Sequence, residues 1–181
     1  MPVYIALLRG INVSGQKKIR MSDLRDILQN SGFPDVRTYI QSGNLVFSST
    51  EEDCTVLRTK IRDVIAAHYG FDVEVWLSEQ EAFMRIADQN PFLGGNDVLD
   101  SNLYYVFLNK PASVEKVEEL QSAIFENEEF RITDQCIYLS CLKGYGKAKC
   151  NNNFFEKRLK VVATTRNLKT VQKLIEISSA I

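Results

Sequence analysis

Three polar clusters hold the side chains with which this chain could bind a ligand, and each lies in a predicted loop or turn. The first, residues 9–18 (RGINVSGQKK), separates an apolar segment from a predicted helix. The free N–H groups and the dipole of a helix start favour anions, and Gly10 and Gly15 would let the backbone approach one closely. A glutamine separates the second glycine from the lysines, so a nucleotide P-loop is not predicted. Arg9 and Asn12 are the candidate anion contacts here.

The second cluster is the predicted hairpin turn at residues 41–44 (QSGN). Glycine and asparagine tolerate the positive φ angles of tight turns, so the turn alone accounts for Gly43 and Asn44. Gln41 and Ser42 are demanded less by the turn. Both interpretations stay open, a structural turn and a polar rim of a site made by Gln41, Ser42 and Asn44.

The third cluster is split between residues 144–149 (GYGKAK) and 164–167 (TTRN). Thr165 or Asn167 could cap the last predicted helix. Arg166 beside that helix start is harder to explain, because the helix dipole repels a cation there. Its position indicates either an anion between the two positive groups or a buried carboxylate partner.

Evidence for catalytic chemistry is thin. The single histidine, His68, lies on the apolar stripe of a predicted helix, and we expect it to be packed rather than reactive. Lys147 and Lys149 could lower the pKa of the Cys150 thiol, but no base or orienting group accompanies it. We therefore predict no catalytic residues.

Composition favours a globular protein of a reducing compartment. Of 181 residues, 45% are hydrophobic and 25% are charged. The apolar N-terminal segment is too short to span a bilayer and lacks the features of a signal peptide. The four cysteines form no Cys-x-x-Cys pair, and reduced thiols are the better interpretation without an export signal. We expect a cytoplasmic protein without membrane, metal or cofactor.

Charge is unevenly distributed along the chain. Residues 1–25 carry five basic side chains and one acidic side chain, residues 26–142 carry eight and twenty, and residues 143–173 carry nine and one. If the two ends of the chain meet in space, they form a basic surface on an acidic body, which favours anionic partners. Ordinary solvated helix faces are the alternative explanation.

Hydrophobic periodicity predicts the order β-α-β-β-α-β twice. The first set comprises a strand at 3–9, a helix at 22–31 with Ser22 as N-cap, strands at 35–41 and 45–48, a helix at 51–70 and a strand at 71–77. A capping box of Ser78 and Glu81 opens a linker helix. The second set comprises a strand at 103–108, a helix at 114–125, strands at 130–133 and 136–142, a helix at 152–159, a strand at 161–164 and a final helix at 168–177.

The predicted fold class is α+β, with two ferredoxin-like βαββαβ halves packed into one compact body. The halves are residues 1–78 and residues 101–181, the latter with an extra C-terminal helix. Residues 79–100 form the linker helix and loop, since Asn90-Pro91 stops the helix and glycines follow.

The chain resembles the domain of unknown function 1697 family, which is bacterial. The matching stretches are YIALLRGINVSG, KIRMSDLRDIL, GFPDVRTYIQSGNLVFSS, GYGKAK and ATTRNLKTV. The resemblance implies an α+β fold with ferredoxin-like halves and no established activity. Three positions depart from the family pattern: Ser14 replaces a usual glycine, Lys147 a common arginine, and Leu168-Lys169 the usual Trp-Asn, which removes an aromatic side chain.

Three functions stay open. The leading hypothesis is a binding protein for an anionic ligand (a nucleotide, a phosphorylated metabolite or a nucleic-acid backbone) at a basic junction between the halves. The alternatives are an enzyme acting on a phosphorylated or carboxylated small molecule, and a structural or interaction module. The candidate ligand contacts are Arg9, Asn12, Gln41, Ser42, Asn44, Lys147, Lys149, Arg166 and Asn167.

Overall fold

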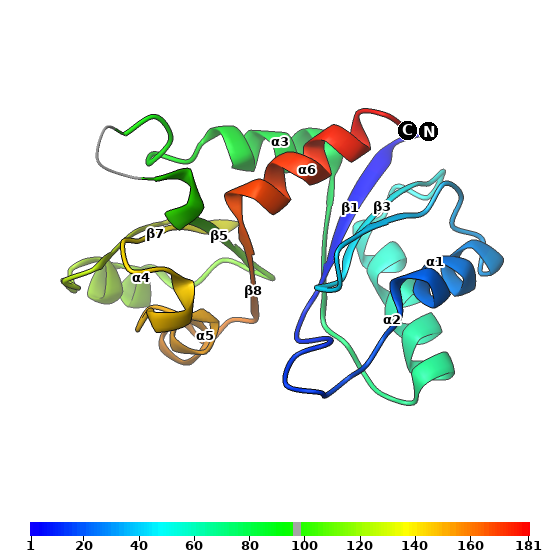
Figure 1. The fold of residues 1–181 in the computed structure, drawn as a ribbon, viewed down its shortest axis with the longest axis horizontal. Coiled ribbons are helices and arrows are strands. Elements are labelled where there is room, and N and C mark those ends of the chain that lie inside the picture. The colour runs from blue at the N-terminus through cyan, green and yellow to red at the C-terminus, as the bar shows by residue number, and fades with distance from the viewer. Residues whose placement is uncertain (96–98) are drawn as a thin grey trace. The chain divides into compact units, whose positions relative to one another are not determined.

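The computed structural model describes residues 1–95 and 99–181 (Figure 1). The described chain divides into two compact units, Met1–Arg85 with Lys173–Ile181, and Ile86–Gln172. The chain leaves the first unit within helix α3 (Gln80–Asp88) and returns to it within helix α6 (Leu168–Ser178). The halves expected at 1–78 and 101–181 stay a prediction.

The described residues form two four-stranded antiparallel sheets and six α-helices, which confirms a mixed α+β fold. In the first unit the sheet order is β2-β3-β1-β4. The elements of this unit, in addition to α3, are β1 (Val3–Leu8), α1 (Met21–Asn30), β2 (Arg37–Tyr39), β3 (Asn44–Ser48), α2 (Cys54–Tyr69) and β4 (Val75–Glu79).

Strand β1 is central in this sheet and apolar on both faces. It pairs with β3 on one side and β4 on the other. Tyr4, Ala6 and Leu8 belong to the core cluster that includes the apolar faces of α1 and α2. Ile5 and Leu7 point to the opposite face and are also fully buried.

Two predicted helix starts are wrong. Helix α1 begins at Met21, and Ser22 donates a hydrogen bond to Asp23 instead of capping the helix. Ser78 lies inside strand β4, so the predicted capping box with Glu81 does not form. Strand pairing with β1 takes precedence there, because β4 extends to Glu79 rather than ending at residue 77.

The second unit has the sheet order β6-β7-β5-β8. Its elements are β5 (Leu103–Leu108), α4 (Val114–Gln121), β6 (Glu128–Ile132), β7 (Cys136–Cys141), α5 (Asn152–Leu159) and β8 (Ala163–Asn167), with short 3-10 turns at Asp100–Asn102 and Tyr145–Lys147. Helices α4 and α5 pack on one face of the sheet, where Phe130, Leu139 and Phe155 join one core cluster. Strand β8 begins and ends later than the predicted 161–164 because it pairs with residues 104–108 of β5.

Two buried tyrosines donate hydrogen bonds to backbone carbonyls near the end of α3. The hydroxyl of Tyr105 donates to the carbonyl of Ala87 at 3.1 Å, and the hydroxyl of Tyr138 donates to that of Ile86 at 2.9 Å. The last carbonyls of a helix have no partner within it, so these two bonds satisfy groups that would otherwise be buried unpaired.

Across the described residues, no helix combines the length and the apolar character that crossing a bilayer requires.

Gly43 is the glycine of the first unit at which an added side chain would be most crowded. Its φ is +78°, its carbonyl accepts from the N–H of Leu8 at 2.8 Å, and an added Cβ would lie 2.7 Å from both the Ile11 Cδ1 and the Leu8 Cβ atoms. Gly15 has a similar φ of +75°, but a Cβ atom added there would meet no neighbouring atom within 4 Å. The two glycines therefore separate the effect of crowding from that of backbone conformation.

Replacing Gly43 by alanine is expected to lower the free energy of unfolding by about 3 kcal/mol, because conformational strain and overpacking add together. Gly15→Ala is the matched control and should cost only about 1 kcal/mol, from the backbone conformation. Urea denaturation followed by circular dichroism measures both. Equal losses in the two variants would contradict the close approach at Gly43.

Candidate functional site

The predicted ligand contacts are divided between the two units. The first unit holds Arg9, Asn12, Gln41, Ser42 and Asn44, and the second holds Lys147, Lys149, Arg166 and Asn167.

Asn12 joins the first two polar clusters. Its side-chain Nδ2 donates to the carbonyls of Ile19, at 2.9 Å, and of Gln41, at 2.8 Å, while its Oδ1 accepts from the N–H of Ile19 at 2.9 Å. Both hydrogens of the amide are therefore engaged with the backbone. The side chain fixes the 9–18 loop against the hairpin turn, with Asn12 itself at a φ of +54°.

The hairpin turn uses its own asparagine in the same way. Asn44 is fully buried, and its Nδ2 donates to the Tyr39 carbonyl and to the Ser42 hydroxyl, both at 2.9 Å. Gln41 is exposed, and Arg9 is half-buried with its backbone N–H donating to the Glu74 carbonyl at 2.9 Å. These bonds support the turn interpretation of Asn44.

In the second unit a hydrogen-bonded network joins the two parts of the third cluster. The Tyr145 hydroxyl donates to Thr165 Oγ1 at 3.2 Å and accepts from the Asn152 N–H at 2.8 Å. Thr165 Oγ1 donates to Asn152 Oδ1 at 3.0 Å. Asn152 Nδ2 donates in turn to the Ala163 carbonyl at 2.8 Å. Sequence reasoning missed Tyr145 and Asn152, although a tyrosine between two loop glycines was a usable signal.

Arg166 is buried in strand β8, with 8% of its surface exposed. Its Nη1 donates to Thr164 Oγ1 at 2.9 Å and to the Thr165 carbonyl at 2.8 Å. Burial lowers the pKa of the Arg166 guanidinium to about 10, so the group still carries its charge at neutral pH. Of the two possible caps of α6, Thr165 and Asn167, the structure shows Asn167 in this role, because its Oδ1 accepts from the Thr170 N–H at 2.8 Å.

The prediction for His68 is wrong, and the lowered pKa that the sequence allowed for Cys150 is not found. His68 is exposed and is not packed in the core. Its ring lies edge-on to the ring of Tyr69, with the two ring centres 4.7 Å apart. Cys150 is fully buried, and burial together with the nearby Glu128 carboxylate raises the pKa of its thiol to about 12. Desolvation outweighs the adjacent lysine because the exposed ammonium is screened by water while the thiol is not solvated.

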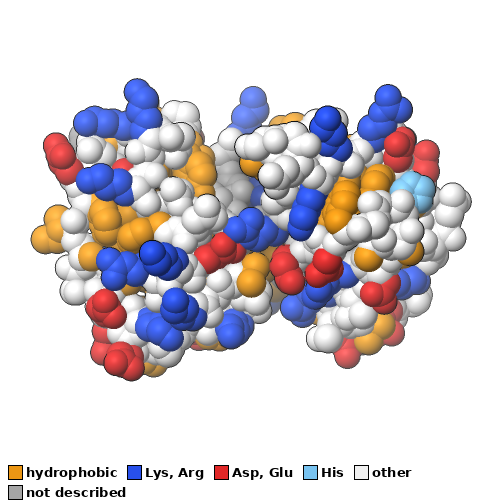
Figure 2. All heavy atoms as spheres, turned by 90° about the horizontal axis from the view of Figure 1, so that it is seen from below, with side chains coloured by type: hydrophobic (Ala, Val, Ile, Leu, Met, Phe, Trp, Pro, Cys, Tyr) orange, Lys and Arg blue, Asp and Glu red, His pale blue; other side chains and the backbone are white. Residues whose placement is uncertain are grey.

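A basic groove lies between α4 and α5, with a volume of ≈ 580 Å³. Four cationic side chains and one carboxylate line it, together with apolar groups; the lining includes Lys116, Glu119, Leu120, Phe154, Lys157, Arg158 and Lys160. Figure 2 shows Lys and Arg side chains gathered over the part of the second unit that carries α5, in the left half of the view. Within the described residues, no three His, Cys, Asp or Glu side chains are grouped so that they could hold a metal ion.

The one carboxylate of this groove is already engaged. Arg158 Nη1 lies 3.6 Å from Glu119 Oε1, and the Arg158 guanidinium lies 5.8 Å from the centre of the Phe154 ring. Lys157 lies in α5 and Lys160 is the residue that follows it. Both side chains are exposed and line the groove. Sequence reasoning counted these lysines within the basic segment 143–173 but did not select them as ligand contacts.

These features define a two-unit α+β protein with a basic groove in its second unit. Residues 1–138 match the family "Protein of unknown function (DUF1697)", so the chain belongs to this family, as the sequence motifs indicate. The residues of α5 that line the groove lie outside the matched range.

A solved structure supports the fold over the whole chain. The chain is similar to "conserved bacterial protein SP0830 from Streptococcus pneumoniae", with 25% sequence identity, a TM-score of 0.73 and coverage of 98% of each chain. A search of curated proteins finds no match.

Tyr145→Phe removes only the hydroxyl that joins the 144–149 loop to β8. The variant is expected to lose about 1–2 kcal/mol of unfolding free energy, because Thr165 and the Asn152 N–H lose a shared partner. Tyr104→Phe is the control, since that hydroxyl makes an exposed bond of 3.3 Å to the Ser101 carbonyl. Chemical denaturation compares the two, and an equal, small loss in both would show that the network does not stabilise the unit.

The cysteines should differ in their reactivity. At pH 8 we expect iodoacetamide to modify the native protein at Cys54, which is half-buried, and to spare Cys136, Cys141 and Cys150, which are buried. Burial raises the pKa of all four thiols, so the thiolate is scarce, and only Cys54 is open to the reagent. Mass spectrometry after digestion identifies the sites, and a guanidinium-unfolded sample should be modified at all four. Preferential modification of Cys150 would restore the low-pKa hypothesis.

Proposed function

We propose that the protein binds phosphate-bearing ligands through the basic surface of its second unit, with the α4–α5 groove as the principal contact. The observation that carries this proposal is the set of four cationic side chains around a hollow of ≈ 580 Å³ with one carboxylate, which Arg158 already engages. Cations that line a concave surface reinforce one another's potential and raise the local concentration of anions.

The loop before α5 extends this basic surface along the chain. Residues 143–160 carry six basic side chains and one acidic side chain, Glu156. Lys147 and Lys149 are exposed and are proposed as additional contacts. Arg166 is proposed to contribute its charge from within β8 rather than by direct contact, since its side chain is buried.

The structural interpretation of the polar motifs has its own support in three residues. Asn12, Asn44 and Asn167 use their amide groups to bond backbone atoms, as turns and caps require. A ligand role for the first-unit residues Arg9, Gln41 and Ser42 stays a prediction. No arrangement among the described side chains favours the enzyme hypothesis.

We also propose that each unit has the ferredoxin-like topology. Two observations support this proposal: the order β-α-β-β-α-β in both units, and the strand orders β2-β3-β1-β4 and β6-β7-β5-β8.

We also propose a cytoplasmic location, because all four cysteines are free thiols.

The test measures binding of a fluorescein-labelled single-stranded 20-nucleotide probe by fluorescence anisotropy across a salt series. Lys157→Glu/Lys160→Glu is expected to weaken binding at least about tenfold at low salt and to reduce the log–log salt slope by about 1.4, which corresponds to two lost phosphate contacts. Arg25→Glu/Arg85→Glu in the first unit changes the net charge equally and is the matched control. Each of these two arginines forms an exposed ion pair with an acidic side chain of its own helix.

Thermal-shift measurements with nucleotides and sugar phosphates form the second arm. A small phosphorylated ligand would be identified by two results together. One of these molecules would raise the melting temperature of the wild type but not of Lys157→Glu/Lys160→Glu, and the oligonucleotide would not bind. Equal weakening in the groove variant and the control would assign binding to net charge alone. Absence of binding in both arms would contradict the proposal.

A further inference from the structure

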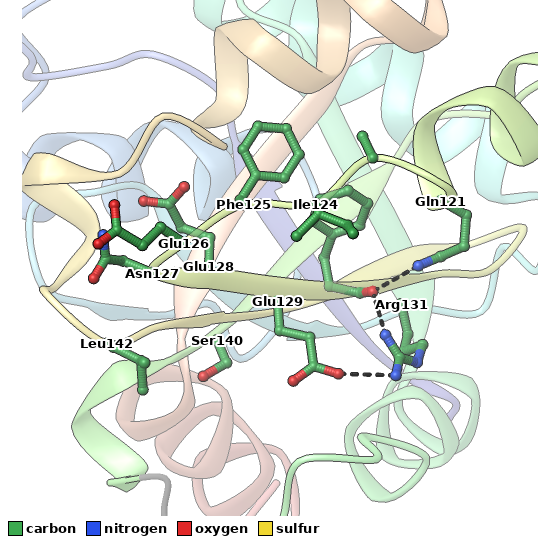
Figure 3. Close-up of a pocket in the computed structure, with 12 residues that line it drawn as sticks. Gln121, Ile124, Phe125, Glu126, Asn127, Glu128, Glu129, Arg131, Ser140 and Leu142 are labelled. Carbon is green, nitrogen blue, oxygen red and sulfur yellow. Dashed lines mark hydrogen bonds and ion pairs between the residues drawn. The ribbon is translucent and has the colours of Figure 1, made fainter.

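Strand β6 forms one edge of the second sheet, and a second hollow lies along it. The hollow has a volume of ≈ 480 Å³ and lies between the segment that precedes β6 and the face of the sheet that carries Glu129, Ser140 and Leu142 (Figure 3). We name it the edge groove.

The pairing of β6 with β7 determines which backbone groups face the edge. Thr133 N donates to the Cys136 carbonyl and Leu142 N to the Asn127 carbonyl, both at 2.9 Å. Hydrogen-bonded pairs alternate along an antiparallel ladder, so the odd-numbered residues of β6 bond to β7. The N–H and C=O groups of the residues at 128, 130 and 132 therefore point outward.

The side chain of Gln121, from the end of α4, occupies part of this edge. Its Nε2 donates to the Phe130 carbonyl at 2.9 Å, and its Oε1 accepts from the Ile132 N–H at 3.1 Å. These are the two bonds that one residue of a parallel neighbouring strand would make. The amide thus takes the place of one residue of a fifth strand and protects the edge from pairing.

The remainder of the edge groove is apolar and acidic. Ile124 is 95% exposed and Leu142 is 54% exposed, which is unusual for large aliphatic side chains beside a hollow. Glu126 and Glu129 add carboxylates, and Figure 3 shows Glu129 directed to Arg131, whose Nη2 lies 2.8 Å from Glu129 Oε1. Charge complementarity therefore selects a partner that carries basic side chains as well as apolar ones.

We propose that the edge groove binds an extended basic segment of a partner protein, which adds to β6 as a fifth strand and displaces the Gln121 amide. Apolar side chains of the segment contact Ile124 and Leu142, and its Lys or Arg side chains lie near Glu126. Strand addition supplies affinity through main-chain hydrogen bonds, and the side chains on alternate positions supply specificity. This site is distinct from the α4–α5 groove, because it selects the opposite charge.

The test measures anisotropy of a fluorescein-labelled ten-residue peptide of alternating lysine and valine, with a glutamate–valine peptide of the same length as the charge control. The lysine peptide is expected to bind and the glutamate peptide to fail. Gln121→Ala should tighten binding about tenfold, because the peptide no longer competes with two hydrogen bonds. Gln172→Ala, an exposed glutamine of α6 in the same unit, is the matched control and should leave the affinity unchanged.

Two further variants locate the bound peptide. Ile124→Ser and Glu126→Lys should each weaken binding about threefold or more through lost apolar burial and charge repulsion. In amide-proton NMR, the peptide should newly protect the N–H groups of residues 128 and 130, and not those of 129 and 131, whose bonds to β7 already exist; the N–H of 132 exchanges Gln121 for the peptide as its partner. The circular dichroism melting curve of each variant verifies that it is folded.

Three results would overturn the proposal. Equal binding of both peptides would remove the charge argument, and an unchanged affinity in Gln121→Ala would remove strand addition. Dimerisation of Gln121→Ala without peptide, seen by size-exclusion chromatography with light scattering, would show that a second copy of this chain is the occupant. None of these results bears on phosphate binding at the α4–α5 groove, so the two proposals fail separately.

Discussion

Both units depend on one constraint, which is that backbone N–H and C=O groups must find partners wherever helices and strands end. An unpaired backbone group buried away from water costs on the order of a whole hydrogen bond, so ends cannot be left incomplete. In this protein side chains supply many of the missing partners. Asn12 and Asn44 do so in the first unit, and Asn152, Tyr105 and Tyr138 do so in the second. The polar motifs that stand out in the sequence are in large part the residues that perform this task.

This constraint decides which polar residues remain for function. A neutral amide that bonds two backbone atoms has little capacity left for a ligand, whereas an exposed lysine ammonium carries three donors that can rotate toward one. The division is visible in the second unit, where the Tyr145–Asn152–Thr165 network closes the loop and Lys147 and Lys149 stay exposed around it. Structural and binding roles can therefore lie side by side in one motif, and motif membership alone does not assign a residue to either.

Hydrophobic periodicity predicted the order of the elements, because it reports burial directly. Helix α5 was predicted with its observed bounds, and Asn167 was one of two residues named as a possible cap of the last helix. The predicted bounds of helix α1 and strand β4 differ from the observed ones, because Ser22 and Ser78 were interpreted as helix caps. Ser22 does not cap α1, and Ser78 pairs with β1 inside strand β4. The basic groove could not be predicted in the same way. Lys116 and Lys157 are distant in sequence, and only the packing of α4 on α5 brings them to one hollow.

In the second unit, grooves of opposite charge border one helix and the segment that follows it. Ala123, after α4, lines both grooves, Lys116 near the start of α4 lines the basic groove, and Gln121 at its end lines the edge groove. An anion held at α5 and a cationic segment held at β6 would attract each other through this unit, so each would bind more tightly when the other is present. Thermodynamic linkage requires this effect to be equal in both directions. Salt would reduce it, because the charges involved are exposed and separated by solvent as well as protein.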